Sequence, residues 1–179
     1  MHDPAAAARF EEIYNSTYKA VLTYITSKSR RTADVADIFQ DTYMELYQVI
    51  SKRGADYVEN DKAFVLRLAK QKLARYYSLL TRLSIFVSLR TVSEEGEGAD
   101  LIGYEAAAFA TEDFAVNQAT LISAKEFIES QPEVVQKIFY LHYELDLKLG
   151  EIAQALGIKE STIKSKLYRS LKELREVLA

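Results

Sequence analysis

The chain has 179 residues, which is enough for one compact domain or two small ones with a buried core. Its hydrophobic content of 49%, with only 6 Gly and 2 Pro, favours an all-helical fold. The absence of Cys and the presence of only 2 His exclude disulfide scaffolds, Cys-based zinc sites and thiol catalysis. With no secretory signal and no apolar run near the ~18 residues that span a bilayer, we expect a soluble, cytoplasmic protein without membrane insertion.

The formal net charge of -3 conceals blocks of opposite sign along the chain. Residues 62–90 contain no Asp or Glu, residues 91–124 contain no Lys or Arg, and basic residues are frequent again after residue 158. Local charge governs contact with a polyanion, so the low pI of about 5.5 does not argue against nucleic-acid binding.

Three amphipathic helices are predicted in the first half of the chain. Asp3 and Pro4 are typical of a helix start, and apolar residues follow at helical spacing. Thr32 is the candidate cap of a second helix, which Gly54 ends, and Asp61 is the candidate cap of the third. Three helices of this length can close around one core.

Two of these helices carry a distinct polar face, which is acidic on the second helix and contains several basic residues on the third. The second has an acidic outer stripe, formed by Asp34, Asp37, Asp41 and Glu45. On the third helix Tyr76 belongs to the apolar face by periodicity, whereas core packing and an exposed role are equally open for Tyr77. The polar face of the third helix carries Arg67, Lys70, Gln71, Ala74, Ser78 and Arg82.

Composition divides the chain into two helical domains joined by an acidic linker. We expect an N-terminal domain over residues 1–90, a flexible acidic linker over 91–114 with some local helix around residues 105–110, and a C-terminal domain over 115–179. Pro132 is the predicted start of a helix in the last domain. Its core candidates are Val135, Ile138, Phe139 and Leu141.

The last thirty residues predict a helix-turn-helix. Ile152, Ala153 and Leu156 lie on one face of a short helix, and Gly157 allows the left-handed turn that ends it. Glu160 or Ser161 begins a longer helix, with Ile163, Leu167, Leu171, Leu174 and Leu178 as its apolar stripe. Lysine-rich helix ends are common because they suit the helix dipole, but the glycine turn and the basic exposed face favour DNA binding over that explanation.

The C-terminal sequence EIAQALGIKESTIKSKLYRSLKELREVL resembles the promoter-binding domain of bacterial RNA polymerase sigma factors of the extracytoplasmic-function (ECF) type. DVADIFQDTYMELYQ is similar to the family's polymerase-docking helix, and KAFVLRLAKQKLARYY to its -10 recognition helix. The resemblance covers residues 8–178 in the family's order. At the start of the helix-turn-helix, Lys148 and Gly150 depart from the family pattern, so either Asp146 caps this helix or the helix begins frayed.

The resemblance implies a role for each polar face. Core polymerase would bind Asp34, Asp37, Gln40, Asp41 and Glu45. The -10 promoter element would contact Arg67, Lys70, Gln71, Ala74, Tyr77 and Arg82. The -35 element would contact Ser161, Thr162, Lys164, Ser165, Lys166 and Arg169. Core RNA polymerase and promoter DNA are thus the implied partners, and whether an anti-sigma factor is a third stays open.

No pattern indicates catalysis or a cofactor. Carboxylates at helical spacing, as in the stripe from Asp34 to Glu45, are usually a solvated face, and no nucleophile accompanies them. His142 lacks partners for a metal site. The leading hypothesis is a sigma factor; the alternatives are a helix-turn-helix repressor or activator with an N-terminal sensor or dimerisation domain, and a polymerase-binding interaction module without -10 recognition.

Overall fold

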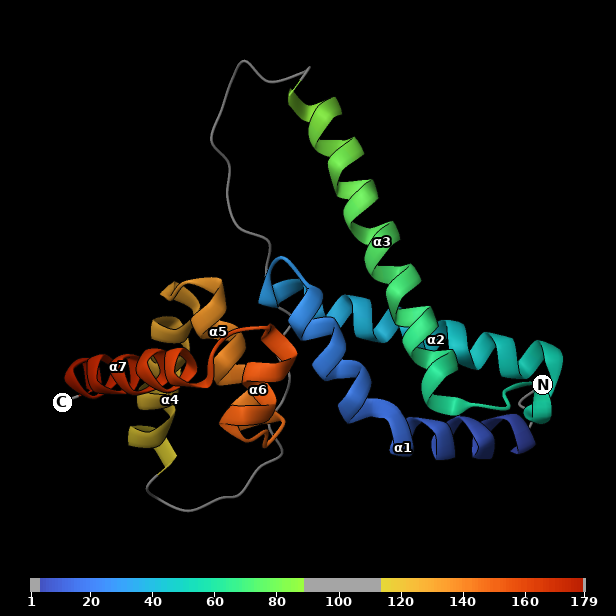
Figure 1. The fold of residues 1–179 in the computed structure, drawn as a ribbon, viewed down its shortest axis with the longest axis horizontal. Helices are drawn as coiled ribbons and strands as arrows, with labels where there is room; N and C mark the ends of the chain where they lie inside the picture. The colour runs from blue at the N-terminus through green and yellow to red at the C-terminus, as the bar shows by residue number, and fades with distance from the viewer. Residues whose placement is uncertain (1–3, 89–113, 179) are drawn as a thin grey trace.

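The computed structural model describes residues 4–88 and 114–178, and within them the side chains of residues 4–78, 120 and 122–178 (Figure 1). All regular structure in these ranges is helical, as the composition predicted. The expected acidic linker and the local helix around residues 105–110 lie outside the described residues, except for Phe114 at the start of a helix.

The first unit consists of three long helices, α1 (Pro4–Lys28), α2 (Val35–Arg53) and α3 (Asp61–Ser88), as the periodicity predicted. Short 3-10 turns, η1 (Thr32–Asp34) and η2 (Ala55–Tyr57), connect them. Each helix contacts the other two, and their apolar faces meet in one core. Fully buried members of this core are Ile13, Val21, Ile25, Ile38, Leu46, Ile50, Val65 and Ala69.

The second unit contains α4 (Phe114–Ser130), α5 (Glu133–Phe139), α6 (Leu149–Leu156) and α7 (Glu160–Leu178). Pro132 precedes α5 as predicted, but the chain then continues into a π-helical turn, η3 (Tyr140–Glu144), which the apolar pattern did not indicate. The four core residues predicted after Pro132 are buried, whereas Leu178, the last residue of the predicted apolar stripe of α7, is 38% exposed. The cluster includes Val135, Ile138, Phe139, Leu141, Ile152, Ile163 and Leu167.

Two predicted helix caps in the first unit are wrong, and for the same reason. Thr32 does not cap α2, because its hydroxyl and backbone N–H donate to Glu133 of the second unit instead. Asp61 does not cap α3, because its carboxylate pairs with Arg9 at 2.7 Å, and Asn60 accepts the backbone N–H of Ala63 at 3.0 Å in its place. In both cases the side chain that the local sequence predicts to be a cap binds a residue distant in sequence instead.

The two units touch through the end of α1. Leu22 packs against both apolar clusters, and so does Tyr140 of η3. Helix α6 contacts α1, and α5 contacts η1. Figure 1 shows α5 and α6 beside the junction of α1 and α2, although α5 and α6 come much later in the sequence.

A buried tyrosine in the first unit gives the fold a pH dependence. Tyr43 is 4% exposed, and its hydroxyl shares a hydrogen bond with Thr17 Oγ1 at 2.9 Å. Burial raises the pKa of Tyr43 to about 12, even though the hydrogen bond with Thr17 opposes the shift. In the folded protein the Tyr43 side chain therefore stays neutral above the pH at which an unfolded tyrosine ionises.

We expect stability to fall between pH 10 and pH 12. In that window only the unfolded chain releases the Tyr43 proton, so rising pH favours unfolding, by up to about 2.7 kcal/mol for a shift of two pKa units. Urea unfolding at pH 8 to 11.5 measures the loss. Tyr43→Phe should flatten the profile, and Tyr57→Phe, at an exposed position, should not; an unchanged profile in Tyr43→Phe would contradict the assignment.

Candidate nucleic-acid interface

Helices α6 and α7 form the helix-turn-helix that the sequence predicted. Gly157 ends α6 in the left-handed conformation, with φ 69° and ψ 32°, and the backbone N–H of Ile158 donates to the carbonyl of Ala153 at 3.1 Å. Ile152 of α6 and Ile163 of α7 are both fully buried in the shared core. The tight turn therefore fixes the second helix against the first and leaves its opposite face exposed.

The glycine turn itself can be tested by substitution. A Cβ at Gly157 would meet no atom within 4 Å, so any cost comes from the positive φ alone. We expect Gly157→Ala to destabilise the C-terminal unit by about 1–2 kcal/mol, and Gly157→Asn to cost less because Asn tolerates this conformation. Thermal unfolding measures both, and equal stability of the two variants would contradict the backbone argument.

The start of α6 differs from the expectation. Asp146 is not its cap: it adopts a positive φ of 53° in the preceding turn, and Lys148 occupies the cap position. The backbone N–H of Lys148 donates to the carboxylate of Glu151 at 2.8 Å. This acidic side chain near the helix start also suits the helix dipole, so α6 begins in a fixed position despite lacking a Ser or Thr cap.

The exposed face of α7 carries the residues predicted to bind the -35 element. Ser161, Lys164, Ser165 and Arg169 are exposed, and Thr162 and Lys166 are half-buried at its edge. Lys164 pairs with Glu160 at 2.8 Å and Arg169 with Glu173 at 2.9 Å. The hydrogen bond with Glu160 raises the pKa of Lys164, so this amine stays cationic.

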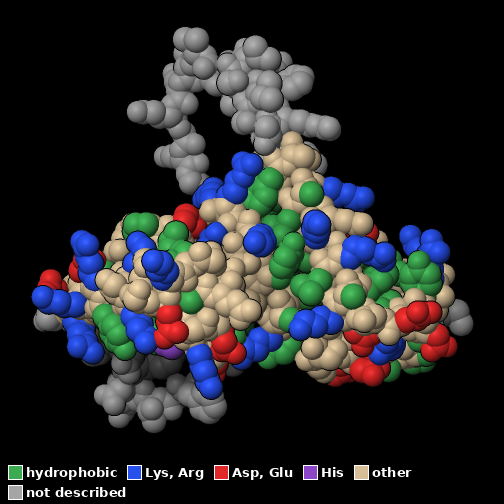
Figure 2. Space-filling model, in the orientation of Figure 1, with side chains coloured by type: hydrophobic (Ala, Val, Ile, Leu, Met, Phe, Trp, Pro, Cys, Tyr) green, Lys and Arg blue, Asp and Glu red, His purple; other side chains and the backbone are tan. Residues whose placement is uncertain are grey.

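One further side chain lies on this face. Tyr168 is 63% exposed, between Lys164 and Lys172 on the helix surface. Its exposed ring adds an aromatic group to the surface that carries these lysines. Figure 2 shows Lys and Arg side chains gathered over α7 and again over α3.

Helix α3 presents the second predicted DNA-binding face. Arg67, Lys70, Gln71 and Ala74 are exposed, and the Arg67 guanidinium lies 4.9 Å from the ring centre of Phe64. Such stacking orients the cation without removing its charge. Arg82, the remaining basic residue of the prediction, lies in the last turns of α3, where side chains are outside the described part of the chain.

Tyr77, predicted to contact the -10 element, is half-buried against the first unit. Its hydroxyl donates to Asp34 Oδ2 at 2.9 Å, and that of Tyr76 donates to Asp34 Oδ1 at 3.2 Å. Burial raises the pKa of both tyrosines, and Asp34 raises it further. Periodicity placed Tyr76 on the apolar face, and its side chain does pack against the core. Its hydroxyl is hydrogen-bonded to Asp34.

The acidic stripe of α2 is shorter than predicted. Asp37, Gln40 and Asp41 are exposed side by side, but Asp34 is only 7% exposed and Glu45 turns toward α3, where it pairs with Lys72 at 2.8 Å. Asp34 lies in η1 rather than in α2, so helical spacing does not apply to it. Three of the five predicted polymerase-binding residues therefore form one exposed polar face.

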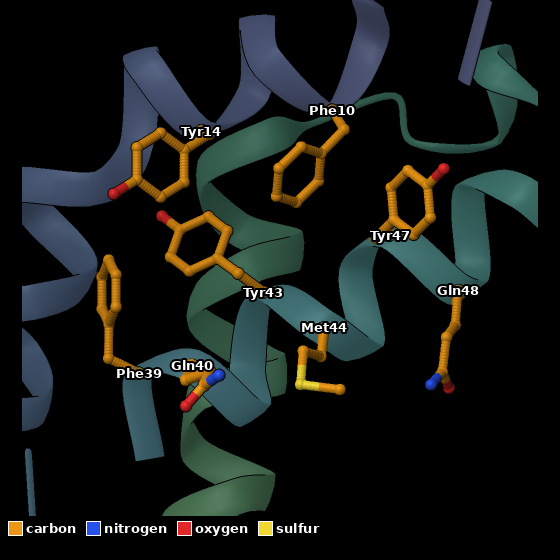
Figure 3. A pocket seen from close by; sticks show the side chains of 8 residues that line it. All are labelled: Phe10, Tyr14, Phe39, Gln40, Tyr43, Met44, Tyr47 and Gln48. Carbon is orange, nitrogen blue, oxygen red and sulfur yellow. The ribbon is translucent and has the colours of Figure 1, made fainter. Parts of the chain in front are cut away.

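An aromatic groove adjoins these residues, which the sequence analysis did not anticipate. It has a volume of about 490 Å³ and lies between α1 and α2 (Figure 3). Its signal in the sequence was the spacing of Phe39, Tyr43 and Tyr47, four residues apart on one side of α2. The remaining lining residues are Phe10, Tyr14, Gln40, Met44 and Gln48.

Neither a metal site nor a membrane-crossing helix occurs in the described ranges. Among these residues no three His, Asp or Glu side chains are grouped so that they could hold an ion. No helix there is both long and apolar enough to cross a bilayer.

The comparisons with known proteins bear on both units. Residues 125–174 match the family model described as Sigma-70, region 4, a range that includes α6 and most of α7, as far as Leu174. Among solved structures, the chain is similar to the sigma factor RpoE of Bartonella quintana, co-crystallised with the anti-sigma factor NepR, with a TM-score of 0.50 and 18% identity over 94% of this chain and 96% of that one. At this identity the likeness shows a shared fold. No curated protein matches the chain.

Proposed function

We infer that this chain is a sigma factor of the ECF type, which binds core RNA polymerase and directs it to specific promoters. The match of residues 125–174 to sigma-70 region 4 carries this conclusion, because that match falls on a helix-turn-helix with an exposed basic face. The fold shared with a solved sigma factor along nearly the whole chain supports it.

Each surface then has a proposed role. The basic face of α7 contacts the -35 element, with Lys164, Lys166 and Arg169 at phosphates or guanine edges and the hydroxyls of Ser161, Thr162 and Ser165 as smaller donors. Arg67, Lys70, Gln71 and Ala74 of α3 contact the -10 element. We propose that these faces belong to two domains, over residues 1–90 and 115–179.

The exposed face of α2 is the proposed docking site for core polymerase. Asp37 and Asp41 supply negative charge, Gln40 supplies an amide, and the adjoining aromatic groove supplies apolar area. A partner element with basic and apolar side chains fits such a surface. Asp34 and Glu45 are left out of this proposal because intramolecular contacts occupy them.

The chain contributes specificity and not chemistry. Transcription is catalysed by the polymerase, so we assign no catalytic residue to this chain. Its proposed partners, promoter DNA and polymerase, meet in the cytoplasm, and we propose that the protein acts there. An anti-sigma factor is a further proposed partner, because the similar solved sigma factor was crystallised with one.

Run-off transcription tests the function. Purified core polymerase is combined with promoter fragments, with and without this protein, and a discrete transcript should appear only with both. Binding of the free protein to duplex DNA is measured in parallel. Tight duplex binding without any transcript would instead indicate a repressor or activator, and polymerase binding without transcript would indicate an interaction module.

A further inference from the structure

The connection between α1 and α2 carries two arginines beside the proposed -10 face. Arg30 and Arg31 are both exposed, and Lys28, the last residue of α1, is exposed next to them. None of the ion pairs between described residues involves Arg30 or Arg31. These two arginines differ in this respect from Lys164 and Arg169 of α7, each of which pairs with a glutamate one turn away.

Tyr77 of α3 holds Arg30 in place. The backbone N–H of Arg30 donates to the Tyr77 hydroxyl at 2.7 Å, and the Arg30 guanidinium lies 5.0 Å from the centre of the Tyr77 ring. The same hydroxyl donates to Asp34 Oδ2 at 2.9 Å, and Asp34 is only 7% exposed. The backbone and the side chain of Arg30 are thus both fixed against α3. Stacking on a ring leaves the charge of a guanidinium and its outward N–H groups available to an anion.

Arg30 lies at one end of the proposed -10 face. Lys70, Ala74 and Tyr77 follow one another at spacings of four and three residues, so they share one side of α3. Lys70 and Ala74 are exposed, and the Arg30 guanidinium lies over Tyr77 at the end of this row. From Arg67 to Tyr77 the helix rises about 15 Å at 1.5 Å per residue, which equals about four base pairs of duplex. The basic surface of α3 therefore continues onto the connection, about four base pairs from Arg67.

This end of the -10 face is the one nearer to the unit proposed to bind the -35 element. The connection contacts α3 through Tyr77, and it contacts α5 of the C-terminal unit through Thr32, which donates to Glu133 at 2.9 Å. In chain order, too, α3 runs from Arg67 through Tyr77 toward the C-terminal unit. The DNA next to Arg30 is therefore the spacer, the duplex that lies between the two promoter elements.

We propose that Arg30 and Arg31 bind phosphates of the spacer duplex directly beside the -10 element, and that Tyr77 positions Arg30 for this contact. The inference rests on the proposed sigma-factor function, and it extends the promoter interface to a segment outside both α3 and the helix-turn-helix. Guanidinium groups suit this role because two of their N–H groups match two phosphate oxygens at once. Phosphate contacts fix the register of a protein on the duplex, so these residues position the holoenzyme without adding base preference.

Holoenzyme binding to a promoter fragment over a salt series tests the charge contact. Arg30→Ala with Arg31→Ala should lower the slope of log affinity against log salt by about 1.8, since each phosphate contact contributes about 0.9. Affinity at about 0.1 M salt should fall at least about tenfold, with base preference unchanged. Lys19→Ala with Lys125→Ala removes two charges at exposed positions of α1 and α4 and should leave the slope unchanged. Arg30→Lys should keep the slope, because it keeps the charge.

Neutral phosphates in the DNA locate the contact. Methylphosphonate linkages, which carry no charge, replace about four spacer phosphates next to the -10 element, the length estimated from the rise of α3. They should weaken binding of the unsubstituted protein by about tenfold or more, and binding of the variant lacking both arginines by less than about twofold. The same linkages downstream of the -10 element are the control and should affect both proteins equally. Circular dichroism and polymerase binding check that the variant is folded, and a general loss of stability would not produce coupling to particular phosphates.

Two substitutions of Tyr77 test its positioning role. Tyr77→Leu removes the ring beneath Arg30 and the hydroxyl that accepts from its backbone, but it removes no charge. We expect the penalty from neutral spacer phosphates to shrink to about threefold, while the penalty from neutral phosphates downstream stays as in the unsubstituted protein. Tyr77→Phe keeps the ring and should give an intermediate penalty. A full spacer penalty in both variants overturns the role of Tyr77.

A failure of this inference differs from a failure of the proposed function. If the holoenzyme binds the promoter, and the variant lacking Arg30 and Arg31 matches the lysine control in salt slope and in its response to neutral spacer phosphates, the inference is overturned and the sigma-factor function stands. If the unsubstituted protein gives no promoter-dependent binding with core polymerase, the proposed function fails and this inference fails with it.

Discussion

We expect the replacement of Asp37 and Asp41 together by lysine to lower the affinity for core RNA polymerase by at least about a hundredfold. Both side chains are exposed on one face of α2, beside Gln40 and the aromatic groove. Reversal places positive charge against a partner surface that we infer to be basic, and juxtaposed like charges in an interface cost several kcal/mol. Co-purification with core enzyme, followed by a binding titration, measures the effect.

The matched control for this pair is Glu11→Lys with Glu59→Lys. It makes the same change in net charge at exposed positions of the first unit outside α2, and it should leave polymerase binding unchanged. Asp37 lies in the first turn of α2, where an acid suits the helix dipole, so helicity is compared by circular dichroism. A folded Asp37 and Asp41 variant that binds polymerase normally would remove α2 as the docking face.

Substitutions on the basic face of α7 should weaken promoter binding in two different ways. Lys164→Ala should lower the slope of log affinity against log salt by about 0.9, as expected when one phosphate contact is lost. Arg169→Ala should cost about 1–3 kcal/mol and relax the preference at one position of the -35 element, as expected for a lost base contact. Holoenzyme binding to promoter variants over a salt series separates the two.

Neither change should disturb the helix. Within the described residues, these two cations pair with Glu160 and Glu173, one turn away at the helix surface, and such surface pairs contribute little to stability. Lys125→Ala, at an exposed position of α4, is the control and should leave binding and slope unchanged. If Lys164→Ala and Arg169→Ala both match this control, the basic face is a solvated surface and not a DNA interface.

Much of the helix-turn-helix could be predicted because its determinants are local. The apolar spacing from Ile163 to Leu167 defines the buried side of α7, and this in turn defines the side that carries Lys164 and Arg169. Gly157 fixes the turn, since its left-handed φ is accessible to glycine at little cost. The periodicity of α2 likewise placed Asp37 and Asp41 on the outside correctly.

The errors in the first unit occurred where a side chain had a choice of partners. Thr32 was predicted to cap α2, and Asp34 was predicted to lie on the outer stripe of that helix. The structure instead pairs Thr32 with Glu133 and buries Asp34 beneath Tyr76 and Tyr77. Local patterns describe what a short segment can do, and they do not indicate which distant residue will compete for the same hydrogen bond.

The sequence by itself determined the helices, the glycine turn and the sign of charge on each exposed face, because periodicity and backbone preference act within a few residues. Only the tertiary structure decided that Tyr77 faces Asp34, that Glu45 faces Lys72, and that α5 closes on the connection between α1 and α2. These contacts join residues from 27 to 101 positions apart, and their formation depends on how whole helices pack. Packing selects one set of partners from several that the local sequence allows.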